Sequence, residues 1–402
     1  MVVWINNPFD NLPEEGARPQ RYAILTRELA RRGHEVTWWT SDFSHVHKAP
    51  RPVPARRWKP GDGAEVRLIP TLPYPRNLCL ARIRSHRAYA ESWKRLAEAA
   101  ANAGELARPD LVLTSLPPLG TAEIARSFRD RWGCRVVVDI MDAWPETFCQ
   151  ALPLPRRLAT LAGRLLFASA WRQARRAVRE ADAVSAVGES YLSWARQLGA
   201  TAPGTVCHHG IDLPAPGEAS APGSGLRLVY VGNMGRSYDL RTLLEAVRGL
   251  DDVRLDLAGT GPDEPALRAQ AAEEIRTGRV RFHGQLPAPE LGALLAQAHV
   301  GVIPMFDRSR VATPYKLADY AAAGVAILET LPGETRSLVE SYGAGLWHPA
   351  GDVAACREAI RRLADHPGLL AACRAGARRL AEERFDAAAI YPAFCEWLEK
   401  RP

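Results

Sequence analysis

One segment of the 402-residue sequence has the residue types of a phosphate-binding loop, YVGNMGRSYDL at 230–240. Gly232 and Gly235 carry no side chain, so backbone amides there could approach an anion closely. Arg236 adds a cation whose forked guanidinium matches the geometry of a phosphate. An apolar run precedes the segment and a helical pattern follows it, and the first amides of a helix also favour an anion. The segment predicts either an anion site or a plain turn between a strand and a helix.

A second segment, TPYKLADYAAAG at 313–324, supplies a lysine and a carboxylate. Pro314 lies where a helix would begin, so the amides of the first turn could face a ligand. Lys316 and Asp319 are three residues apart and would share one face of that helix. The lysine could neutralise a phosphate, and the carboxylate could accept hydrogen bonds from the hydroxyls of a ribose. The alternative is an ordinary surface ion pair, which contributes little stability.

Two acidic residues in the first half of the chain close an apolar run, in DIMDAWPE at 139–146. Asp139 lies within the run, where we expect it to satisfy backbone donors and to take no part in catalysis. Asp142 lies just past the end of the run and is better placed for chemistry, because ligands of parallel sheets bind at the strand ends. Trp144 and Pro145 either line a sugar site or pack within the loop.

Apolar, β-branched runs precede these segments and are typical of strands buried on both faces of a parallel sheet. Eleven such runs alternate with helical patterns, at 2–6, 35–41, 65–69, 110–115, 134–140, 183–187, 226–232, 253–259, 279–284, 299–304 and 325–330. A stretch rich in proline, glycine, alanine and serine, at 209–225, separates the sixth run from the seventh. The pattern predicts an α/β fold with two doubly wound, Rossmann-like parallel-sheet domains. We expect the two domains to face each other across a cleft that holds the site.

Composition narrows the function classes. The hydrophobic share of 47% and the charged share of 24% are those of a globular protein. The seven cysteines include no CxxC pair, and the clustered histidines have no carboxylate or thiolate at ligand spacing, so we expect neither a disulfide framework nor a metal site. No apolar run reaches the roughly 18 residues of a membrane span, and the N-terminus lacks the features of a signal peptide. We therefore expect a cytoplasmic protein.

The net charge of +7 is unevenly distributed. Residues 1–205 carry 30 Lys and Arg against 20 Asp and Glu, whereas the rest of the chain is slightly acidic. Within 155–180, five arginines fall in about one quadrant of a helical wheel, with apolar residues across the remainder. These arginines are Arg157, Arg164, Arg172, Arg175 and Arg179. The basic face suits an anionic membrane surface, and the alternative is a packed helix with a solvated basic face. Nucleic acid is not an expected partner, because no recognised binding module is present.

The motifs taken together resemble those of the family 4 glycosyltransferases of the two-domain GT-B architecture, which handle nucleotide sugars in bacterial polysaccharide assembly. The resemblance covers nearly the full length of the chain. It is carried, in order, by PEEGARPQRYA (13–23), DIMDAWPE, YVGNMGRSYDL, LAGTGPDE (257–264), VRFHG (280–284), TPYKLADYAAAG and the tail at 351–385. The ordered set is far more specific than any single motif.

The resemblance implies an enzyme that moves a hexose or N-acetylhexosamine from a nucleoside-diphosphate sugar to a lipid-linked or saccharide acceptor, with retention of configuration. It implies an acceptor-side domain over 1–208, a nucleotide-sugar-binding domain over 209–384 and a C-terminal helix over 385–402 that packs back on the first domain. We expect no cofactor and no metal, because the sequence has no Asp-x-Asp motif and offers fixed cations instead. A lipid-linked acceptor would fit contact with the inner face of the cytoplasmic membrane.

The resemblance also implies roles for individual residues. Arg236 and Lys316 match the positions that hold the donor diphosphate, and Asp319 matches the residue that binds the donor ribose. Asp142 would lie at the sugar and acceptor end, and it completes the predicted catalytic set with the two cations. Many relatives carry a second acid eight positions before the ribose-binding residue, where this chain has Val311. The remaining predicted substrate contacts are Gly16, Gly232, Asn233, Gly235, His283, Gly284, Thr313 and Pro314.

Other functions fit the same architecture. A nucleotide-sugar 2-epimerase or hydrolase would need a set of acids and bases around the sugar, of which only Asp142 is identified. A non-catalytic subunit could bind the donor within a polysaccharide assembly complex. An NAD-linked oxidoreductase is not expected, because no GxGxxG follows the first apolar run and residues 7–16 contain a single glycine.

Overall fold

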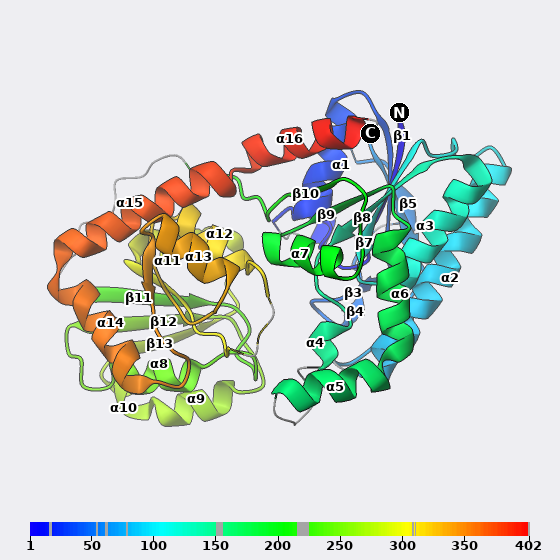
Figure 1. The fold of residues 1–402 in the computed structure, drawn as a ribbon. Helices are drawn as coiled ribbons and strands as arrows, with labels where there is room; N and C mark the ends of the chain where they lie inside the picture. The colour runs from blue at the N-terminus through cyan, green and yellow to red at the C-terminus, as the bar shows by residue number, and fades with distance from the viewer. Residues whose placement is uncertain are drawn as a thin grey trace. The chain divides into compact units, whose positions relative to one another are not determined.

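The computed structural model describes residues 1–15, 18–53, 55–60, 63–77, 79–149, 156–214, 225–307, 309 and 311–400 (Figure 1). The chain divides into two compact units. Unit 1 contains Met1–His208 and Tyr391–Pro402, and unit 2 contains His209–Ile390. The chain therefore passes from unit 1 to unit 2 and returns to unit 1 at its end.

The core of unit 1 is a sheet with the strand order β10-β9-β8-β7-β1-β2-β6-β5. All neighbours pair in parallel except β5, which is antiparallel to β6. The strands are β1 (Val2–Asn6), β2 (Glu35–Ser41), β5 (Arg57–Trp58), β6 (Glu65–Ile69), β7 (Leu111–Leu116), β8 (Arg135–Ile140), β9 (Ala183–Ala186) and β10 (Gly204–Val206). The strand order reverses between β1 and β7, and ligands of such sheets bind at this reversal.

Helices cover both faces of this sheet, because its central strands are buried along almost their whole length. The helices described in unit 1 are the 3-10 turn η1 (Pro13–Glu15), α1 (Arg21–Arg31), α2 (Leu80–Asn102), α3 (Leu119–Trp132), α4 (Glu146–Cys149), α5 (Arg156–Leu166), α6 (Ala168–Arg179) and α7 (Glu189–Gln197). Helices α2, α3 and α6 pack side by side, and α1 packs on β2.

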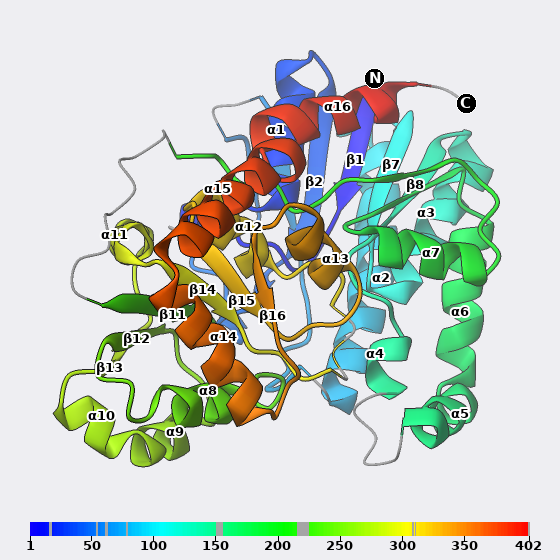
Figure 2. The same cartoon turned by 60° about the vertical axis from the view of Figure 1, so that its left-hand side comes forward.

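Unit 2 has a parallel sheet with the strand order β13-β12-β11-β14-β15-β16, which is the order of a dinucleotide-binding domain. Its strands are β11 (Leu226–Val231), β12 (Val253–Ala258), β13 (Val280–Gly284), β14 (Val300–Ile303), β15 (Ala326–Glu329) and β16 (Gly345–Trp347). Its described helices are α8 (Leu240–Val247), α9 (Glu264–Gln270), α10 (Ala272–Arg276), α11 (Ala288–Gln297), α12 (Tyr315–Ala322), α13 (Glu334–Ser341), α14 (Val353–Asp365) and α15 (Pro367–Arg384). Helices α8 and α14 share one apolar core with the sheet, and α12 and α15 share another. Figure 2 shows these four helices beside the sheet. The strand order reverses between β11 and β14.

The predicted fold class is confirmed, and each of the eleven predicted runs forms a strand within one or two residues of its expected bounds. The sequence pattern missed the short strands β3 (Phe43–Ser44), β4 (Ala49–Pro50), β5, β10 and β16. Two or three residues are too few to show a period. Most of the predicted linker at 209–225 lies outside the described residues, since only 209–214 and 225 are described.

The basic segment at 155–180 is not the single helix that a continuous helical wheel assumes. Helix α5 ends at Leu166. The next residue, Phe167, has a non-helical ψ of 28° and precedes the first residue of α6. The predicted arginine face is therefore divided between two helices, and the side chain of Arg157 lies outside the described residues. Among the described helices, none is long and apolar enough to cross a membrane.

Asp139 of β8 belongs to a fully buried ion pair that ties α1 to the sheet. Its carboxylate accepts hydrogen bonds from Arg21 Nε at 2.8 Å and Arg21 Nη2 at 3.0 Å. Tyr22 Oη and Ser185 Oγ donate to the same carboxylate, each at 2.7 Å. The expectation that Asp139 satisfies backbone donors is therefore wrong in detail, because side chains from α1 and β9 saturate it. With all its donors inside unit 1, this charge is structural.

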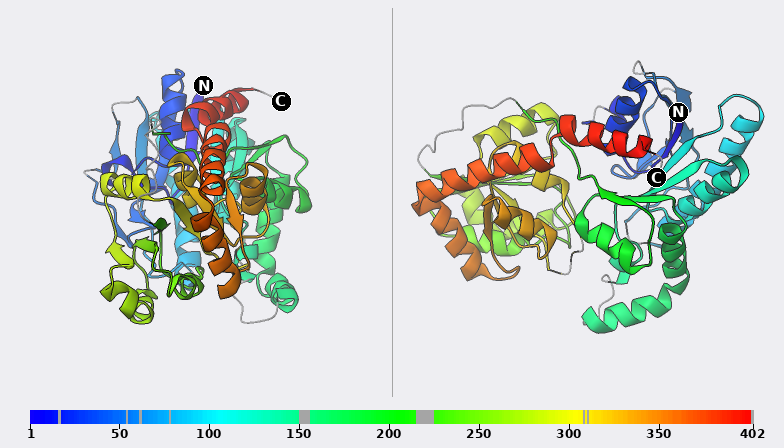
Figure 3. Two further views of the ribbon diagram at one scale, coloured as in Figure 1. Left: turned by 90° about the vertical axis from the view of Figure 1, so that its left-hand side faces the viewer. Right: turned by 45° about the horizontal axis from the view of Figure 1, so that its top comes forward.

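Helix α16 (Ala387–Glu399) lies beside α1 in unit 1 (Figure 3). Arg32 donates to Glu399 at 2.6 Å, and His34 Nε2 lies 2.8 Å from the same carboxylate. The hydrogen bond from Arg32 lowers the pKa of Glu399 to about 2. At the start of β8, Arg135 Nη1 donates to the carbonyl of Leu398 at 2.8 Å. The predicted segment began at 385, whereas the helix begins at Ala387 and its first residues group with unit 2.

Candidate functional site

The loops that follow β11 and β14 meet at the point where the strand order of unit 2 reverses. Tyr238 forms an antiparallel bridge with Met305, and the amide of Asp239 donates to the carbonyl of Pro304 at 2.6 Å. Asp239 also caps α8 by accepting a hydrogen bond from the amide of Thr242. These backbone contacts fix the glycine-containing loop at 232–239 against the segment that leads to α12. The two segments singled out in the sequence are therefore neighbours in space.

Lys316 on the first turn of α12 is a buried cation, with 7% of its surface exposed. Its Nζ lies 4.2 Å from the ring centroid of Tyr230 and 4.1 Å from that of Tyr238. Within the described part of the chain, Nζ has no hydrogen-bond partner. Burial lowers the pKa of Lys316 to about 7, and the carboxylate of Asp319 offsets part of this shift. The alternative of a surface ion pair with Asp319 is wrong, because Lys316 is neither at the surface nor hydrogen-bonded to Asp319.

Gly232 leaves open the approach to this ammonium group. Its φ is 142°, and a Cβ there would lie 3.0 Å from Lys316 Nζ and 3.4 Å from Tyr230 Oη. A side chain would therefore cover the cation. The backbone of Gly232 is itself packed closely, since a Cβ on Gly259 would lie 2.0 Å from its carbonyl oxygen. The amide of Gly259 donates in turn to the carbonyl of Gly284 at 2.6 Å, which brings the end of β13 to the same edge.

The other predicted residues of unit 2 lie around these two loops. Asn233 and Arg236 are exposed in the loop after β11, and the carbonyl of Asn233 accepts a hydrogen bond from Tyr230 Oη at 2.5 Å. Gly235 is in the same loop, where a Cβ would lie 2.9 Å from the side chain of Asn233. Pro314 is the residue before α12, Thr313 beside it is buried, and Asp319 is half-buried one turn after Lys316.

The side chain of His283 contacts its neighbour on β12. Its Nε2 lies 2.6 Å from Asp256 Oδ1. The side chain is thus engaged between two adjacent strands, and only the backbone of His283 and Gly284 remains as the predicted contact.

Three features of this edge were not predicted. Tyr230 and Tyr238 flank the cation, and both stand in the segment first singled out, but spacing does not show that they reach Lys316. At the end of β15, Glu329 is completely buried, and burial raises its pKa to about 8. One of its oxygens accepts a hydrogen bond from the amide of Leu331 at 2.6 Å. Burial therefore favours the protonated form of Glu329, and its place inside a strand gave no functional signal in the sequence.

In unit 1, Asp142 follows β8 and holds the loop at 142–148. It accepts hydrogen bonds from Trp144 Nε1 at 3.0 Å and Thr147 Oγ1 at 2.8 Å. Burial raises the pKa of Asp142, and these hydrogen bonds partly oppose the increase. Trp144 is 4% exposed and stacks on His86 with ring centroids 4.9 Å apart. Trp144 is therefore held both by its hydrogen bond within the loop and by packing against α2.

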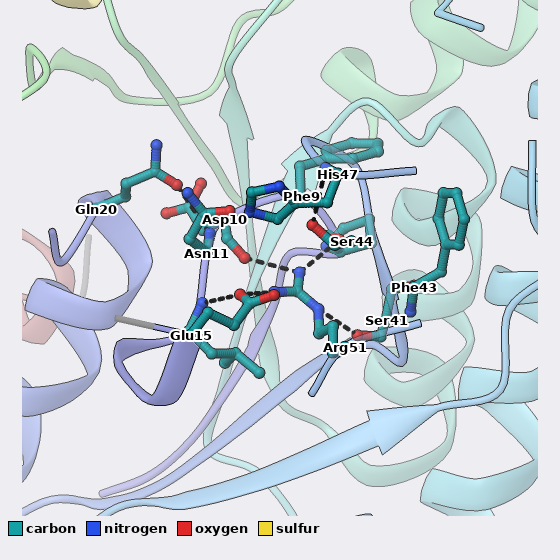
Figure 4. Close-up of polar contacts among 12 residues, drawn as sticks. Phe9, Asp10, Asn11, Glu15, Gln20, Ser41, Phe43, Ser44, His47 and Arg51 are labelled. Atoms are coloured by element: carbon teal, nitrogen blue, oxygen red, sulfur yellow. Dashed lines mark hydrogen bonds and ion pairs between the residues drawn. The ribbon is translucent and has the colours of Figure 1, made fainter. Parts of the chain in front are cut away.

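The first loop of unit 1 contains Gly16, which lies outside the described residues, as does Ala17. The part of the loop that precedes them is held by Arg51, as Figure 4 shows. Arg51 Nη2 donates to the carbonyl of Asp10 at 2.8 Å, and its Nε donates to that of Ser41 at 2.7 Å. Arg51 also pairs with Glu15, which accepts a hydrogen bond from the amide of Leu12 at 2.6 Å. This clamp, which the sequence did not reveal, fixes the approach to Gly16.

Metal ligands were not predicted, and in the described ranges no group of three or more His, Cys, Asp or Glu side chains could hold a metal ion. Among the predicted residues, Lys316 and Arg236 carry positive charge at this edge of unit 2.

Two family models match the chain. Residues 20–210 match a glycosyl transferase 4-like domain, and residues 225–366 match the glycosyl transferases group 1. No curated protein sequence gives a match.

Several solved structures are similar over the whole chain. Sucrose-phosphate synthase from Thermosynechococcus elongatus is 16% identical, with a TM-score of 0.73 over 99% of this chain and 98% of that one. HepE from Anabaena, in complex with UDP and glucose, is 14% identical, with a TM-score of 0.67 over 100% of both chains. The lipopolysaccharide outer core galactosyltransferase WaaB is 12% identical, with a TM-score of 0.59 over 99% of this chain and 98% of that one. At these identities the likeness is one of fold.

We expect the affinity for inorganic pyrophosphate to depend on the protonation of Lys316. Because burial lowers the pKa of Lys316 to about 7, the lysine is partly neutral in the unliganded protein and must take up a proton to pair with the anion. Affinity should therefore fall with rising pH above about 7, by up to about tenfold per pH unit. Affinity is measured by calorimetry from about pH 6 to about pH 9 on the wild-type protein and on Lys316→Arg. The ratio of the two affinities removes the effect of the titration of pyrophosphate itself, since arginine stays charged throughout.

The expected result is a ratio of wild-type to Lys316→Arg affinity that declines above neutral pH. Lys316→Met should weaken binding at every pH, whereas the matched exposed variant Lys59→Met should not. A ratio that stays flat across the range would contradict the assignment of Lys316 to an anion site.

Proposed function

We propose a sugar transfer for this chain, which belongs to the family 4 glycosyltransferases of the GT-B class. It would move a hexose or N-acetylhexosamine from a nucleoside-diphosphate sugar to a lipid-linked or saccharide acceptor. The observation that carries the donor half is the buried Lys316 ammonium, which lacks a hydrogen-bond partner in the described chain and lies under Gly232. Crystals of the structurally similar HepE contain UDP with glucose, or UDP-glucose, which supports a nucleotide sugar as the donor.

Transfer requires the departing diphosphate to be stabilised as its negative charge grows. Lys316 and Arg236 would supply fixed positive charge, and the amides of the loop at 232–236 and of the first turn of α12 would supply hydrogen bonds. Asp319, one turn after the lysine, would accept hydrogen bonds from the ribose. With this charge already in place, the reaction would proceed without a metal ion. Val311, where many relatives carry an acid, is exposed and offers no hydrogen bond to the donor sugar.

A panel of nucleotides tests the donor assignment. Thermal unfolding is measured with UDP, GDP, TDP and NAD in the presence of a chelator. We expect one nucleoside diphosphate to raise Tm and NAD to leave it unchanged, because a ligand at about 100 times its Kd stabilises the folded protein by about 2.7 kcal/mol. Lys316→Met should lose this shift, and Lys59→Met should keep it. A panel without any stabilising nucleoside diphosphate would refute the donor site, and a strict need for added metal would refute the metal-free scheme.

Asp142 is proposed to act at the sugar and acceptor end. Retention of configuration would leave proton removal from the acceptor to a donor phosphate oxygen, and Asp142 would then orient the sugar or the acceptor. In an inverting scheme, the pKa of Asp142, which burial raises, would suit it to act as the general base.

Asp142→Asn should lower sugar transfer by about 100-fold or more under either scheme, without lowering nucleotide affinity. The amide removes the charge. Its NH2 group replaces one of the two acceptor oxygens, so either the hydrogen bond from Trp144 or the one from Thr147 is lost. Transfer is assayed with the sugar nucleotide that the panel selects, after Tm shows that the variant is folded. Asp130→Asn, an exposed carboxylate on α3, is the matched control. Near-normal turnover by Asp142→Asn would remove this residue from the site.

Helix α5 supports a proposed contact of unit 1 with an anionic lipid surface. Its small residues Ala159 and Gly163 face the protein, and a Cβ on Gly163 would lie 2.2 Å from Cys149 Sγ. Its large residues face outward: Leu158 is 54% exposed, Leu161 61%, Leu165 74% and Leu166 69%. A helix that packs through small residues and exposes leucines suits insertion into a bilayer interface. Exposed arginines of α6, at 172, 175 and 179, add attraction to anionic lipid.

The double variant Leu161→Ser/Leu165→Ser should bind vesicles of mixed neutral and anionic lipid about tenfold more weakly than wild type. Binding of the wild-type protein should fall with added salt and should be absent on purely neutral vesicles. Val311→Ser, which removes an exposed apolar side chain from unit 2, is the matched control. Failure of the wild-type protein to sediment with anionic vesicles would refute the contact.

A further inference from the structure

Unit 1 carries a group of cations to which the proposed donor site assigns no role. It surrounds Arg82, on the first turn of α2, where the loops after β1, β2, β6 and β8 meet. We define it as the Arg82 cluster, which contains Phe9, His45, Lys48, Tyr74, Arg82, His86 and Trp144. All of these residues lie at the carboxyl ends of parallel strands, where ligands of doubly wound sheets bind.

Arg82 is held within aromatic rings. Its guanidinium carbon lies 4.6 Å from the ring centroid of Trp144, 5.4 Å from that of Phe9 and 5.8 Å from that of Tyr74. Its Nε donates to His86 Nε2 at 3.3 Å, and its Nη1 donates to the carbonyl of Asn77 at 2.9 Å. The rings and these two hydrogen bonds fix the orientation of the guanidinium, so a ligand would meet a preformed donor.

Lys48 brings a second cation to the same place. Its Nζ donates to Asn77 Oδ1 at 2.6 Å and to the carbonyl of His45, and it lies 4.9 Å from the ring centroid of Tyr74. Lys48 has a φ of 55° and is the one non-glycine residue with positive φ in the described chain. The backbone is thus held in an unfavourable conformation at the residue that carries this charge.

No carboxylate is in direct contact with either of these two cations in the described chain. Among the described residues, neither Lys48 nor Arg82 forms an ion pair with Asp or Glu, whereas the nearby Arg51 pairs with Glu15. Burial and the charge of Arg82 lower the pKa of Lys48 to about 8 and that of His45 to about 3. The imidazole of His45 is therefore neutral. The carboxylate of Asp142 attracts Arg82 without forming an ion pair with it, so the two half-buried positive charges are only partly balanced.

We propose that the Arg82 cluster binds a phosphate group carried by the acceptor, with Arg82 and Lys48 as its charged donors. A phosphate would supply the missing negative charge and enough oxygen atoms to accept from both side chains. The identification of this phosphate compound as the acceptor rests on the proposed sugar transfer. Trp144 links the cluster to Asp142 through its 3.0 Å hydrogen bond, which would bring the bound acceptor to that carboxylate.

An amphiphilic phosphate is favoured over a soluble one by the surface beside Arg82. Leu80 is 72% exposed and Ile83 is 41% exposed, and both lie on the same first turn of α2. These two side chains project in other directions from α2 than Arg82 does, so a hydrocarbon chain attached to the bound phosphate would contact them by extending past the guanidinium.

The test measures binding of three probes without nucleotide. These are a short prenyl monophosphate below its critical micelle concentration, the corresponding prenol, and inorganic phosphate. We expect the prenyl phosphate to bind, the prenol to bind at least about tenfold more weakly, and Lys48→Gln/Arg82→Gln to weaken prenyl phosphate binding at least about tenfold. The control Lys59→Gln/Arg95→Gln changes two exposed cations of unit 1, so net charge changes equally and binding should stay within about twofold of wild type.

Each outcome decides the proposal. Inorganic phosphate that binds as tightly as the prenyl phosphate, with the same loss in the variant, assigns the site to a soluble phosphorylated acceptor. Unchanged binding in Lys48→Gln/Arg82→Gln, equal binding of the prenol, or no binding of either phosphate overturns it. Arg82→Lys keeps the charge and should retain most of the affinity, so it separates the loss of a donor from the loss of packing. The rise of Tm with a nucleoside diphosphate should be the same in these variants as in the wild-type protein. If no nucleoside diphosphate stabilises the wild-type protein, only the donor site is refuted.

Discussion

An almost completely buried ammonium group without a hydrogen-bond partner in the described protein is the constraint on which the edge of unit 2 depends. Burying a cation in this way is unfavourable. The faces of Tyr230 and Tyr238 recover part of the cost by cation–π attraction, and the lowered pKa of Lys316 lets the group lose its proton. An incoming diphosphate reverses this balance, because it supplies the negative charge that the site lacks. Gly232 is needed at the same point, since any side chain there would cover the cation.

The pairing of buried charges separates structural from functional groups in this protein. In unit 1, Arg21 and Asp139 are fully buried and form an ion pair. Tyr22 and Ser185 also donate to Asp139, and Arg21 Nη1 donates to the carbonyls of Cys207 and His208. Such a network holds α1 on the sheet and leaves nothing for a ligand. Lys316 in unit 2 and the Arg82 cluster in unit 1 show the opposite pattern, with positive charge near aromatic rings and, in the described chain, no ion pair between a carboxylate and Arg82 or Lys48. An anionic ligand gains most binding free energy where positive charge without an ion-pair partner lies at the carboxyl ends of parallel strands.

The elements of the fold followed closely from the sequence, and the exceptions have physical causes. Long β-branched runs identify buried parallel strands, because both faces of each strand must be apolar. Strands of two or three residues, such as β16, carry no such pattern. The basic wheel at 155–180 assumed an unbroken helix, but the backbone turns at Phe167 and divides it. Asp139 was recognised as structural from its place inside a strand, yet its partners on α1 and β9 were not visible in the local sequence.

The sequence alone determined that glycines, an arginine, a lysine and an aspartate would follow the strands of a parallel sheet, because spacing and residue type set local backbone structure. Tertiary structure decided how deeply Lys316 is buried, which rings surround it and which cations of unit 1 gather around Arg82. These properties depend on contacts between segments far apart in the chain, such as the loops after β11 and β14. Such segments become neighbours through the strand order of the sheet, and no short sequence pattern records that order.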